Sequence, residues 1–193
     1  QVGVFPEQLL NWDWINKRLS NIERPVKILN AFAYTGVATL VASASSKNIE
    51  VWHVDNAKSF ITWARENASL SGLEDNVIHW VIEDVIKFLE REVKRGHKYD
   101  GLILDPPAFG RSKNKIWKLS KDLPRLVELM GLVLNDNPSI VSLSWHDSSL
   151  SSDTVLEMLD NLSQIKKRKL EVVDLIIPAV NGHDLPAGKC VRF

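Results

Sequence analysis

An apolar run that ends in an acid and two prolines is the most chemically suggestive stretch of this chain. Residues 100–111 read DGLILDPPAFGR, so Asp105 stands at the tip of a strand-like segment. Pro106 and Pro107 fix φ and disfavour helix, which keeps the backbone extended beside the acid. A carboxylate in that position can accept hydrogen bonds from a ligand.

Two further acids follow strand-like segments in the same way. Asp55 ends a run about 20 residues after the turn at 30–36, where an acid can accept two hydrogen bonds from a ribose diol. Asp84 ends the next run and can accept a hydrogen bond from an exocyclic amine such as that of adenine. Each acid by itself is equally well explained as a helix N-cap. Acids at three successive strand ends favour a nucleoside-containing cofactor.

The turn NAFAYTG at 30–36 joins the first strand to a helix that we expect to start near Thr35. Gly36 lets the backbone come close to a ligand, and Thr35 can act as the N-cap. The spaced glycines of a dinucleotide fingerprint are absent, so a pyrophosphate cradle is not supported. The alternative to a ligand-binding turn is an ordinary strand-to-helix turn without a ligand.

Short β-rich runs alternate with helical patterns, which is typical of a parallel sheet with crossover helices. We expect strands at 26–33, 49–55, 77–84, 99–105 and 139–145. Helical spacing of apolar residues predicts helices at 56–72, with Gly72 at its C-terminal end, 85–95 and 123–134.

The last part of the chain changes character. Two extended runs, 169–178 and 188–193, predict an antiparallel strand pair at the sheet edge. The predicted fold class is therefore α/β, an open, doubly wound, mostly parallel seven-stranded sheet with an antiparallel C-terminal strand pair. Ligands of such sheets bind beyond the carboxyl ends of the strands, where the acids lie.

Size and composition are those of one globular domain. The chain has 193 residues, of which 45% are hydrophobic and 25% charged, and its formal net charge is zero. These values exclude disordered and fibrous classes and argue against binding of nucleic acid by overall charge, although a local basic patch stays possible. We expect a single domain over 1–193, and the start at Gln1 suggests that an N-terminal part of a longer protein is missing.

The cysteine count and the hydropathy of the chain indicate the cellular compartment in which we expect the protein. The single cysteine, Cys190, excludes an intrachain disulfide framework and a cysteine-rich zinc site, and we expect it to be a buried structural residue. No apolar run is long enough for a membrane span, no secretory signal is visible, and no cluster has metal-ligand spacing. We therefore expect a cytoplasmic protein without a metal and without a membrane partner.

With these residues in place, the chain resembles the class I S-adenosylmethionine-dependent methyltransferases. More narrowly, it resembles the bacterial group that methylates carbon 5 of a cytosine in the 23S ribosomal RNA of the large subunit. The matching blocks are GVFPEQ (3–8), ILNAFAYTGVATL (28–40), VWHVDNAKSFITWARENASLSGL (51–73), IEDVIKFL (82–89) and YDGLILDPPAF (99–109).

The resemblance implies a role for each matching residue. The turn would surround the methionine part of S-adenosylmethionine, Asp55 would hold the ribose, and Asp84 with Val85 would face the adenine. The implied cofactor contacts are Phe5, Gln8, Phe32, Ala33, Tyr34, Thr35, Gly36, Asp55, Asn56, Ala57, Asp84, Val85 and Asp105. The implied catalytic residues are Asp105, Pro106 and Pro107 beside the transferred methyl group and Phe109 beside the substrate base. Leu9 replaces the arginine that usually follows the glutamine of the first block.

One departure concerns the nucleophile. Methylation at carbon 5 of cytosine normally requires a thiolate that adds to the ring. The resembled group carries that cysteine within a Ser-Cys-Ser element on the fifth strand, where this chain has Leu143. Methylation of a nitrogen needs only positioning and an acceptor for the amine hydrogens, a role that Asp105 can fill. We therefore expect a nitrogen target on a nucleobase, stacked on Phe109 or Trp117.

A basic stretch follows the presumed active-site loop. Basic side chains around one aromatic ring suit contact with RNA, and the residues of this stretch are Arg111, Lys113, Lys115, Trp117 and Lys118. An ordinary solvated loop is the alternative, and we expect the second basic run, 166–169, to be a soluble turn. His146 after the fifth strand is either a base near the site or a hydrogen-bonded loop residue.

We conclude that the sequence predicts transfer of a methyl group to a base in ribosomal RNA. Two alternatives stay open: a methyltransferase that acts on a protein or small molecule, and a non-catalytic relic that binds the cofactor or RNA.

Overall fold

One mixed sheet organises the molecule. A computed structural model describes residues 3–111, 116–180 and 182–193. Its seven-stranded sheet has the order β3-β2-β1-β4-β7-β9-β8. The strands are β1 (Val26–Ala31), β2 (Ile49–Asp55), β3 (Ile78–Ile82), β4 (Gly101–Leu104), β7 (Ile140–Trp145), β8 (Glu171–Ile177) and β9 (Leu185–Arg192). β9 runs antiparallel to both of its neighbours, and the other pairs are parallel, which confirms the predicted fold class.

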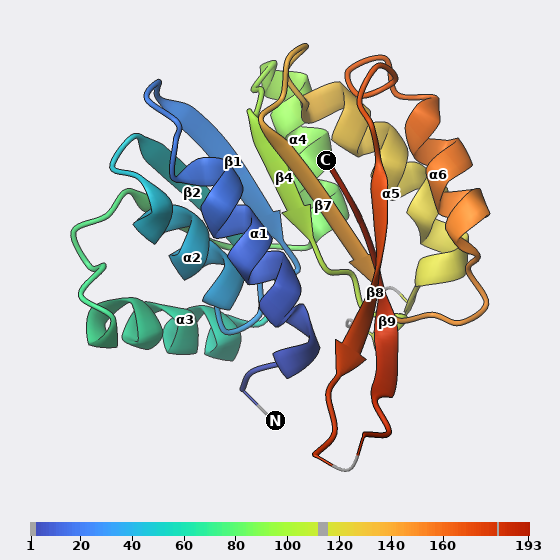
Figure 1. The fold of residues 1–193 in the computed structure, drawn as a ribbon. Coiled ribbons are helices and arrows are strands. Elements are labelled where there is room, and N and C mark those ends of the chain that lie inside the picture. The colour runs from blue at the N-terminus through green and yellow to red at the C-terminus, as the bar shows by residue number, and fades with distance from the viewer. Residues whose placement is uncertain (1–2, 112–115, 181) are drawn as a thin grey trace.

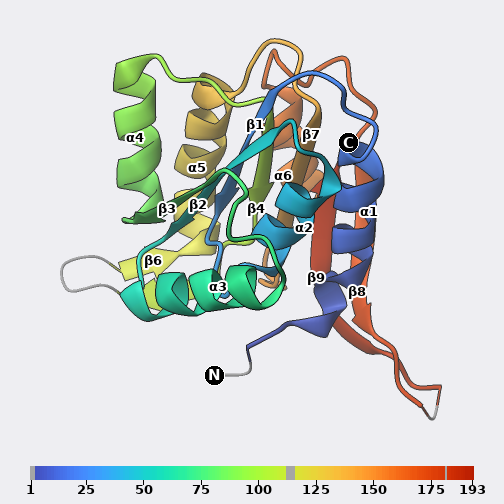
Figure 2. The same cartoon turned by 90° about the vertical axis from the view of Figure 1, so that its left-hand side faces the viewer.

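Helices cover both faces of this sheet (Figures 1 and 2). One face carries α1 (Leu9–Leu19), α2 (Val37–Ser45) and α3 (Lys58–Leu70), and the other carries α4 (Val85–Arg95), α5 (Leu119–Val133) and α6 (Ser152–Asp160). A short 3-10 helix, η1 (Pro6–Gln8), precedes α1, and a separate hairpin pairs β5 (Phe109–Arg111) with β6 (Ile116–Lys118). None of the described helices combines the length and the apolar character that a membrane span needs.

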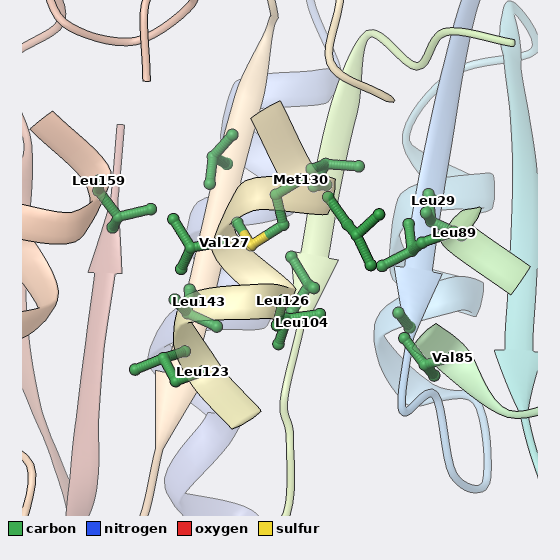
Figure 3. Close-up of a cluster of buried hydrophobic side chains, with 14 of the residues drawn as sticks. Leu29, Val85, Leu89, Leu104, Leu123, Leu126, Val127, Met130, Leu143 and Leu159 are labelled. Carbon is green, nitrogen blue, oxygen red and sulfur yellow. The ribbon is translucent and has the colours of Figure 1, made fainter. Parts of the chain in front are cut away.

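Alternation along the strands builds two apolar cores. Because successive strand residues point to opposite faces, β7 sends Leu143 toward α5 and Ile140 toward α1. The larger core lies under α4, α5 and α6, where Leu143 joins Leu126 and Met130 (Figure 3). A smaller core on the other face includes Ile15 of α1. Both faces of the sheet are therefore held by burial of apolar side chains.

The predicted element boundaries need small corrections. The first strand stops at Ala31 rather than at residue 33, because Phe32 already has a positive φ of 57°. The third strand covers only Ile78–Ile82. Helix α5 begins at Leu119, four residues early, where the Asp122 carboxylate accepts a hydrogen bond from the Lys118 backbone N–H at 2.9 Å.

The expected N-cap at Thr35 is wrong. Helix α2 begins at Val37, and its N-cap is Gly36, which has a φ of 94° and makes no side-chain capping bond. The Thr35 hydroxyl instead donates to the Gly3 carbonyl oxygen at 2.5 Å. The left-handed conformation of Gly36 places the N-cap one residue after Thr35. The Thr35 side chain instead holds the N-terminal segment.

The two methionines of the chain offer a matched test of the larger core. Met130 is fully buried in it, whereas Met158 of α6 is only partly buried against it. We expect Met130→Ala to lower the free energy of unfolding by about 2–5 kcal/mol through lost burial and a residual cavity. Met158→Ala should cost clearly less. Urea denaturation of both variants measures this, and equal costs would contradict the assignment of Met130 to the core.

Candidate active site

A cavity of about 540 Å³ lies beyond the carboxyl ends of the parallel strands. The predicted residues that line it are Phe5, Phe32, Tyr34, Asp55, Asn56, Asp84, Val85, Asp105, Pro107, Arg111 and Trp117. A smaller adjoining cavity of about 60 Å³ is lined by the predicted residues Gln8, Ala33, Thr35 and Gly36. Ala57, Pro106, Phe109 and Lys118 line neither cavity, and Lys113 and Lys115 fall outside the described residues.

The turn between β1 and α2 forms a strained wall of the cavity. Phe32 and Tyr34 have positive φ angles of 57° and 49°, which residues with a Cβ seldom adopt. A Cβ at Gly36 would lie 2.9 Å from the Cβ of Ala64 on α3, so only glycine lets the helix pack this closely. Such strain persists where surrounding contacts enforce it, and it often marks a functional site.

Asp55 is the contact that enforces this turn. Its two carboxylate oxygens accept hydrogen bonds from the backbone N–H groups of Tyr34 and Ala57, each at 3.0 Å. The side chain is nearly buried, and this burial raises the pKa of the carboxyl group, while the backbone donors oppose that rise. A carboxylate oxygen can accept more than one hydrogen bond, so Asp55 keeps acceptor capacity toward the cavity.

Asp84 combines the two roles that its position suggested. It is the N-cap of α4, with its carboxylate accepting from the backbone N–H of Lys87 at 3.1 Å. It also lines the cavity together with Val85. An ordinary capping function and a place at the cavity are therefore compatible in this residue.

Aromatic rings line the cavity beside the strained turn. The Tyr34 ring lies 5.5 Å from the Phe5 ring and 4.5 Å from the Phe60 ring, in an edge-on arrangement with the latter. Phe60 is not among the predicted site residues, because a phenylalanine at helical spacing reads as a core residue. Only the fold shows that this face of α3 opens on the cavity.

Two side chains hold the carboxylate of Asp105. Gln8 donates its amide N–H to Oδ2 at 2.9 Å, and Nε2 of His146 lies 3.1 Å from Oδ1. Asn11 in turn donates to the Gln8 Oε1 at 2.7 Å, which fixes the orientation of that amide. Gln8, predicted as a cofactor contact, thus bonds directly to the strand-end acid. We call this arrangement of Gln8, Asp105 and His146 the Asp105 clamp.

His146 is charged in the Asp105 clamp. Its pKa is raised to about 9, mainly by the hydrogen bond to Asp105, against the opposing effect of burial. The sequence leaves open whether this histidine is a loop residue or part of the site. It is both hydrogen-bonded after β7 and placed on the cavity wall beside Asp105.

The β5–β6 hairpin closes another side of the cavity. The Trp117 indole N–H donates to the Pro107 carbonyl oxygen at 2.7 Å, and its ring lies 5.3 Å from that of Phe32. Phe109 is 56% exposed and lines neither cavity. Through its hydrogen bond to Pro107, Trp117 anchors the hairpin, and its ring packs against Phe32.

No thiol reaches the cavity. The only cysteine, Cys190, is fully buried on β9, with its Sγ 3.4 Å from the Ser142 Oγ, and burial raises the pKa of the thiol. Leu143 is 1% exposed and belongs to the core under α5 (Figure 3). Among the residues that the structure describes, no group of His, Cys, Asp and Glu side chains is arranged to hold a metal ion.

Comparisons with known proteins find ribosomal RNA methyltransferases among the relatives of the chain. No protein-family model matches the chain. It is 27% identical over 148 residues to ribosomal RNA large subunit methyltransferase I of Erwinia tasmaniensis, covering 77% of this chain and 37% of that protein. It is 32% identical over 117 residues to ribosomal RNA large subunit methyltransferase K/L of Chromohalobacter salexigens, covering 60% of this chain and 15% of that protein.

A solved structure matches over the whole chain. The SAM-dependent methyltransferase from Agrobacterium tumefaciens superimposes with a TM-score of 0.87 at 35% identity, covering 100% of this chain and 63% of that one. The chain thus spans less than two thirds of the length of each of these proteins. The chain is thus similar in sequence to the ribosomal RNA large subunit methyltransferases I and K/L, and it has the class I methyltransferase fold.

Proposed function

We propose that the chain is an S-adenosylmethionine-dependent methyltransferase that acts on a base in ribosomal RNA. The observation that carries this proposal is that Asp55 and the clamped Asp105 line one cavity at the carboxyl ends of the strands. The names of its relatives support both the cofactor and the RNA substrate.

The cavity residues suit the cofactor by their chemistry. Asp55 has acceptor capacity for a ribose diol, and Asp84 keeps a carboxylate oxygen beyond the one that caps α4. The strained backbone of the turn brings peptide groups to the cavity wall, and the ring of Tyr34 adds an apolar surface. Asp55 would hold the ribose, Asp84 the adenine, and the turn with Tyr34 the methionine part.

A nitrogen of the base is the proposed methyl acceptor. When bound, the cofactor would supply a methyl group on a sulfonium. Its transfer to a neutral nitrogen would form the N–C bond, break the S–C bond and release S-adenosylhomocysteine and one proton, without a covalent enzyme intermediate. Asp105 would accept a hydrogen bond from the amine N–H and so orient the nitrogen toward the methyl group. The thiolate that the carbon 5 route requires has no candidate here, because Cys190 is buried away from the cavity.

The β5–β6 hairpin is the proposed RNA contact. Arg111 lines the cavity mouth, and Lys118 is exposed at the other end of the hairpin. Lys113 and Lys115 extend this basic stretch in the sequence. Arginine and lysine beside an aromatic ring suit phosphate contacts near a stacked base.

Binding of S-adenosylhomocysteine tests the cofactor assignment. Asp55→Asn should weaken binding by about tenfold or more in isothermal titration, because a hydrogen bond to a charged group contributes about 1.5–3 kcal/mol. Asp75→Asn, an exposed acid before β3, is the matched control and should bind like the wild type. Thermal unfolding of both variants separates loss of binding from loss of fold. Equal affinity of the Asp55 variant and the wild type would contradict the role of Asp55.

The target atom is tested through the only cysteine. Cys190→Ala should keep the wild-type rate of methyl transfer to ribosomal RNA, and mass spectrometry of the nucleosides should show a methyl group on nitrogen. Cys190 takes part in no step of the proposed chemistry, so only stability should change. A folded Cys190→Ala variant without activity, together with 5-methylcytosine as the wild-type product, would refute the nitrogen target.

Removal of two charges tests the RNA contact. The double variant Arg111→Gln, Lys118→Gln should raise KM for RNA and lower the slope of log affinity against log salt by about 0.7 for each phosphate that the variant no longer neutralises. The control is Lys166→Gln, Lys167→Gln, which removes equal charge from the exposed run before β8. An unchanged KM for RNA in the first variant would contradict the assignment of the β5–β6 hairpin as the RNA contact.

A further inference from the structure

Both ring nitrogens of His146 face oxygen atoms that can only accept hydrogen bonds. Nδ1 lies 2.5 Å from the carbonyl oxygen of Ala187, and Nε2 lies 3.1 Å from Oδ1 of Asp105. A neutral imidazole carries one N–H and would present a lone pair to one of these oxygens. With Asp105 ionised, the geometry therefore favours a doubly protonated, cationic ring.

A β-bulge in the last strand pair builds the Ala187 side of this contact. Leu175 of β8 pairs with Gly188, but the next residue, Ile176, pairs with Pro186, so the register skips Ala187. Bulges of this kind redirect backbone groups and are frequent beside active sites. The β8–β9 hairpin extends beyond the sheet at the end where the N-terminal segment lies (Figure 1).

Gly188 makes the close approach possible. Its φ of +136° is unfavourable for residues with a side chain. A Cβ at this position would lie 2.7 Å from Nδ1 of His146 and 2.6 Å from the carbonyl oxygen of Trp145. The sequence thus places a glycine at a position where any side chain would displace His146.

The charges around His146 favour the cation. Asp105 from the end of β4 and Glu7 from η1 both raise its pKa, and the Ala187 carbonyl adds to this effect. The nearby cation of β9, Lys189, is held by Asp174 at 2.7 Å. Burial acts in the opposite direction, but the pKa stays near 9, so the ring is charged at neutral pH.

We propose that His146 is a positioning residue, whose cationic ring ties the Asp105 carboxylate to the β8–β9 bulge and so fixes the acceptor that orients the substrate amine. This inference rests on the proposed function. Gln8 holds one carboxylate oxygen and His146 the other, so the plane of the carboxylate is set from two sides. Loss of His146 leaves the Asp105 carboxylate held by Gln8 through Oδ2 alone, so its plane is no longer set from two sides.

Kinetics of two variants test the positioning role. His146→Ala should lower kcat by about tenfold to a hundredfold, since small misplacements of a catalytic group have effects of that size. Affinity for S-adenosylhomocysteine and KM for RNA should be unchanged, because His146 bonds to neither ligand in this scheme. His146→Gln retains one amide donor for Asp105 and should recover part of the rate. A kcat of His146→Ala equal to that of the wild type would overturn the proposal.

A pair of glycine variants tests the bulge without changing the clamp residues. Gly188→Ala should lower kcat as His146→Ala does, because its Cβ displaces the ring. Gly182→Ala is the matched control: it lies on the same hairpin with a φ of +79°, and no atom lies within 4 Å of its Cβ position. It should keep the wild-type kcat. Thermal unfolding checks that both variants fold, and a folded Gly188→Ala enzyme with full kcat would contradict the role of the bulge.

A titration that needs no substrate separates this inference from the proposed function. Imidazole NMR should show His146 of the wild type titrating near pH 9, and nearer 6.5 in Asp105→Asn. Because the folded pKa is raised, the stabilisation is complete below about pH 6.5 and is lost as pH rises through about 9. The kcat should fall over the same upper range. Titration near 6.5 in the wild type would overturn the inference even if RNA is methylated, whereas absence of methylation with titration near 9 would refute only the proposed function.

Discussion

The fixed carboxylate of Asp105 is the constraint on which the rest of the site depends. Its two donors come from distant parts of the chain, Gln8 from the N-terminal 3-10 helix and His146 from the residue after β7. Each donor is held by a further partner, Asn11 for the amide and Ala187 for the ring. The clamp therefore joins the N-terminal segment, two adjacent parallel strands and the C-terminal hairpin at one point of the cavity wall.

A second network, centred on Asp55, stabilises a turn whose backbone conformation is unfavourable by itself. The left-handed residues between β1 and α2 cost conformational energy that the turn cannot recover by itself. Asp55 offsets this cost with hydrogen bonds to Tyr34 and Ala57, and the packing of α3 on Gly36 confines the turn further. The same carboxylate therefore both supports the turn and lines the cavity.

The sequence predicted the strands and the acids that follow them, but it did not predict the contacts between these acids and distant residues. Acids after strands and period-two alternation are local signals, so the sheet, its antiparallel last pair and the places of Asp55, Asp84 and Asp105 followed from them. The clamp depends on pairs of residues far apart in the chain, such as Gln8 with Asp105, for which a single sequence carries no signal. The bulge at Ala187 depends on strand register, which alternation alone does not determine.

One face of β7 packs into the core, and the other face supports the candidate site. Alternation sends Val141, Leu143 and Trp145 into the core under α5, where a polar or reactive group would lose its hydration without reaching the cavity. Ser144 points to the other face and lies 3.4 Å from Oε1 of Gln8, so that face supports the clamp. A leucine at position 143 thus serves the core, while the strand contributes to the site through its polar face and through His146, which follows its last residue. Asp105 offers the cavity a charged hydrogen-bond acceptor, which suits the proposed nitrogen target, because a nitrogen needs orientation rather than covalent activation.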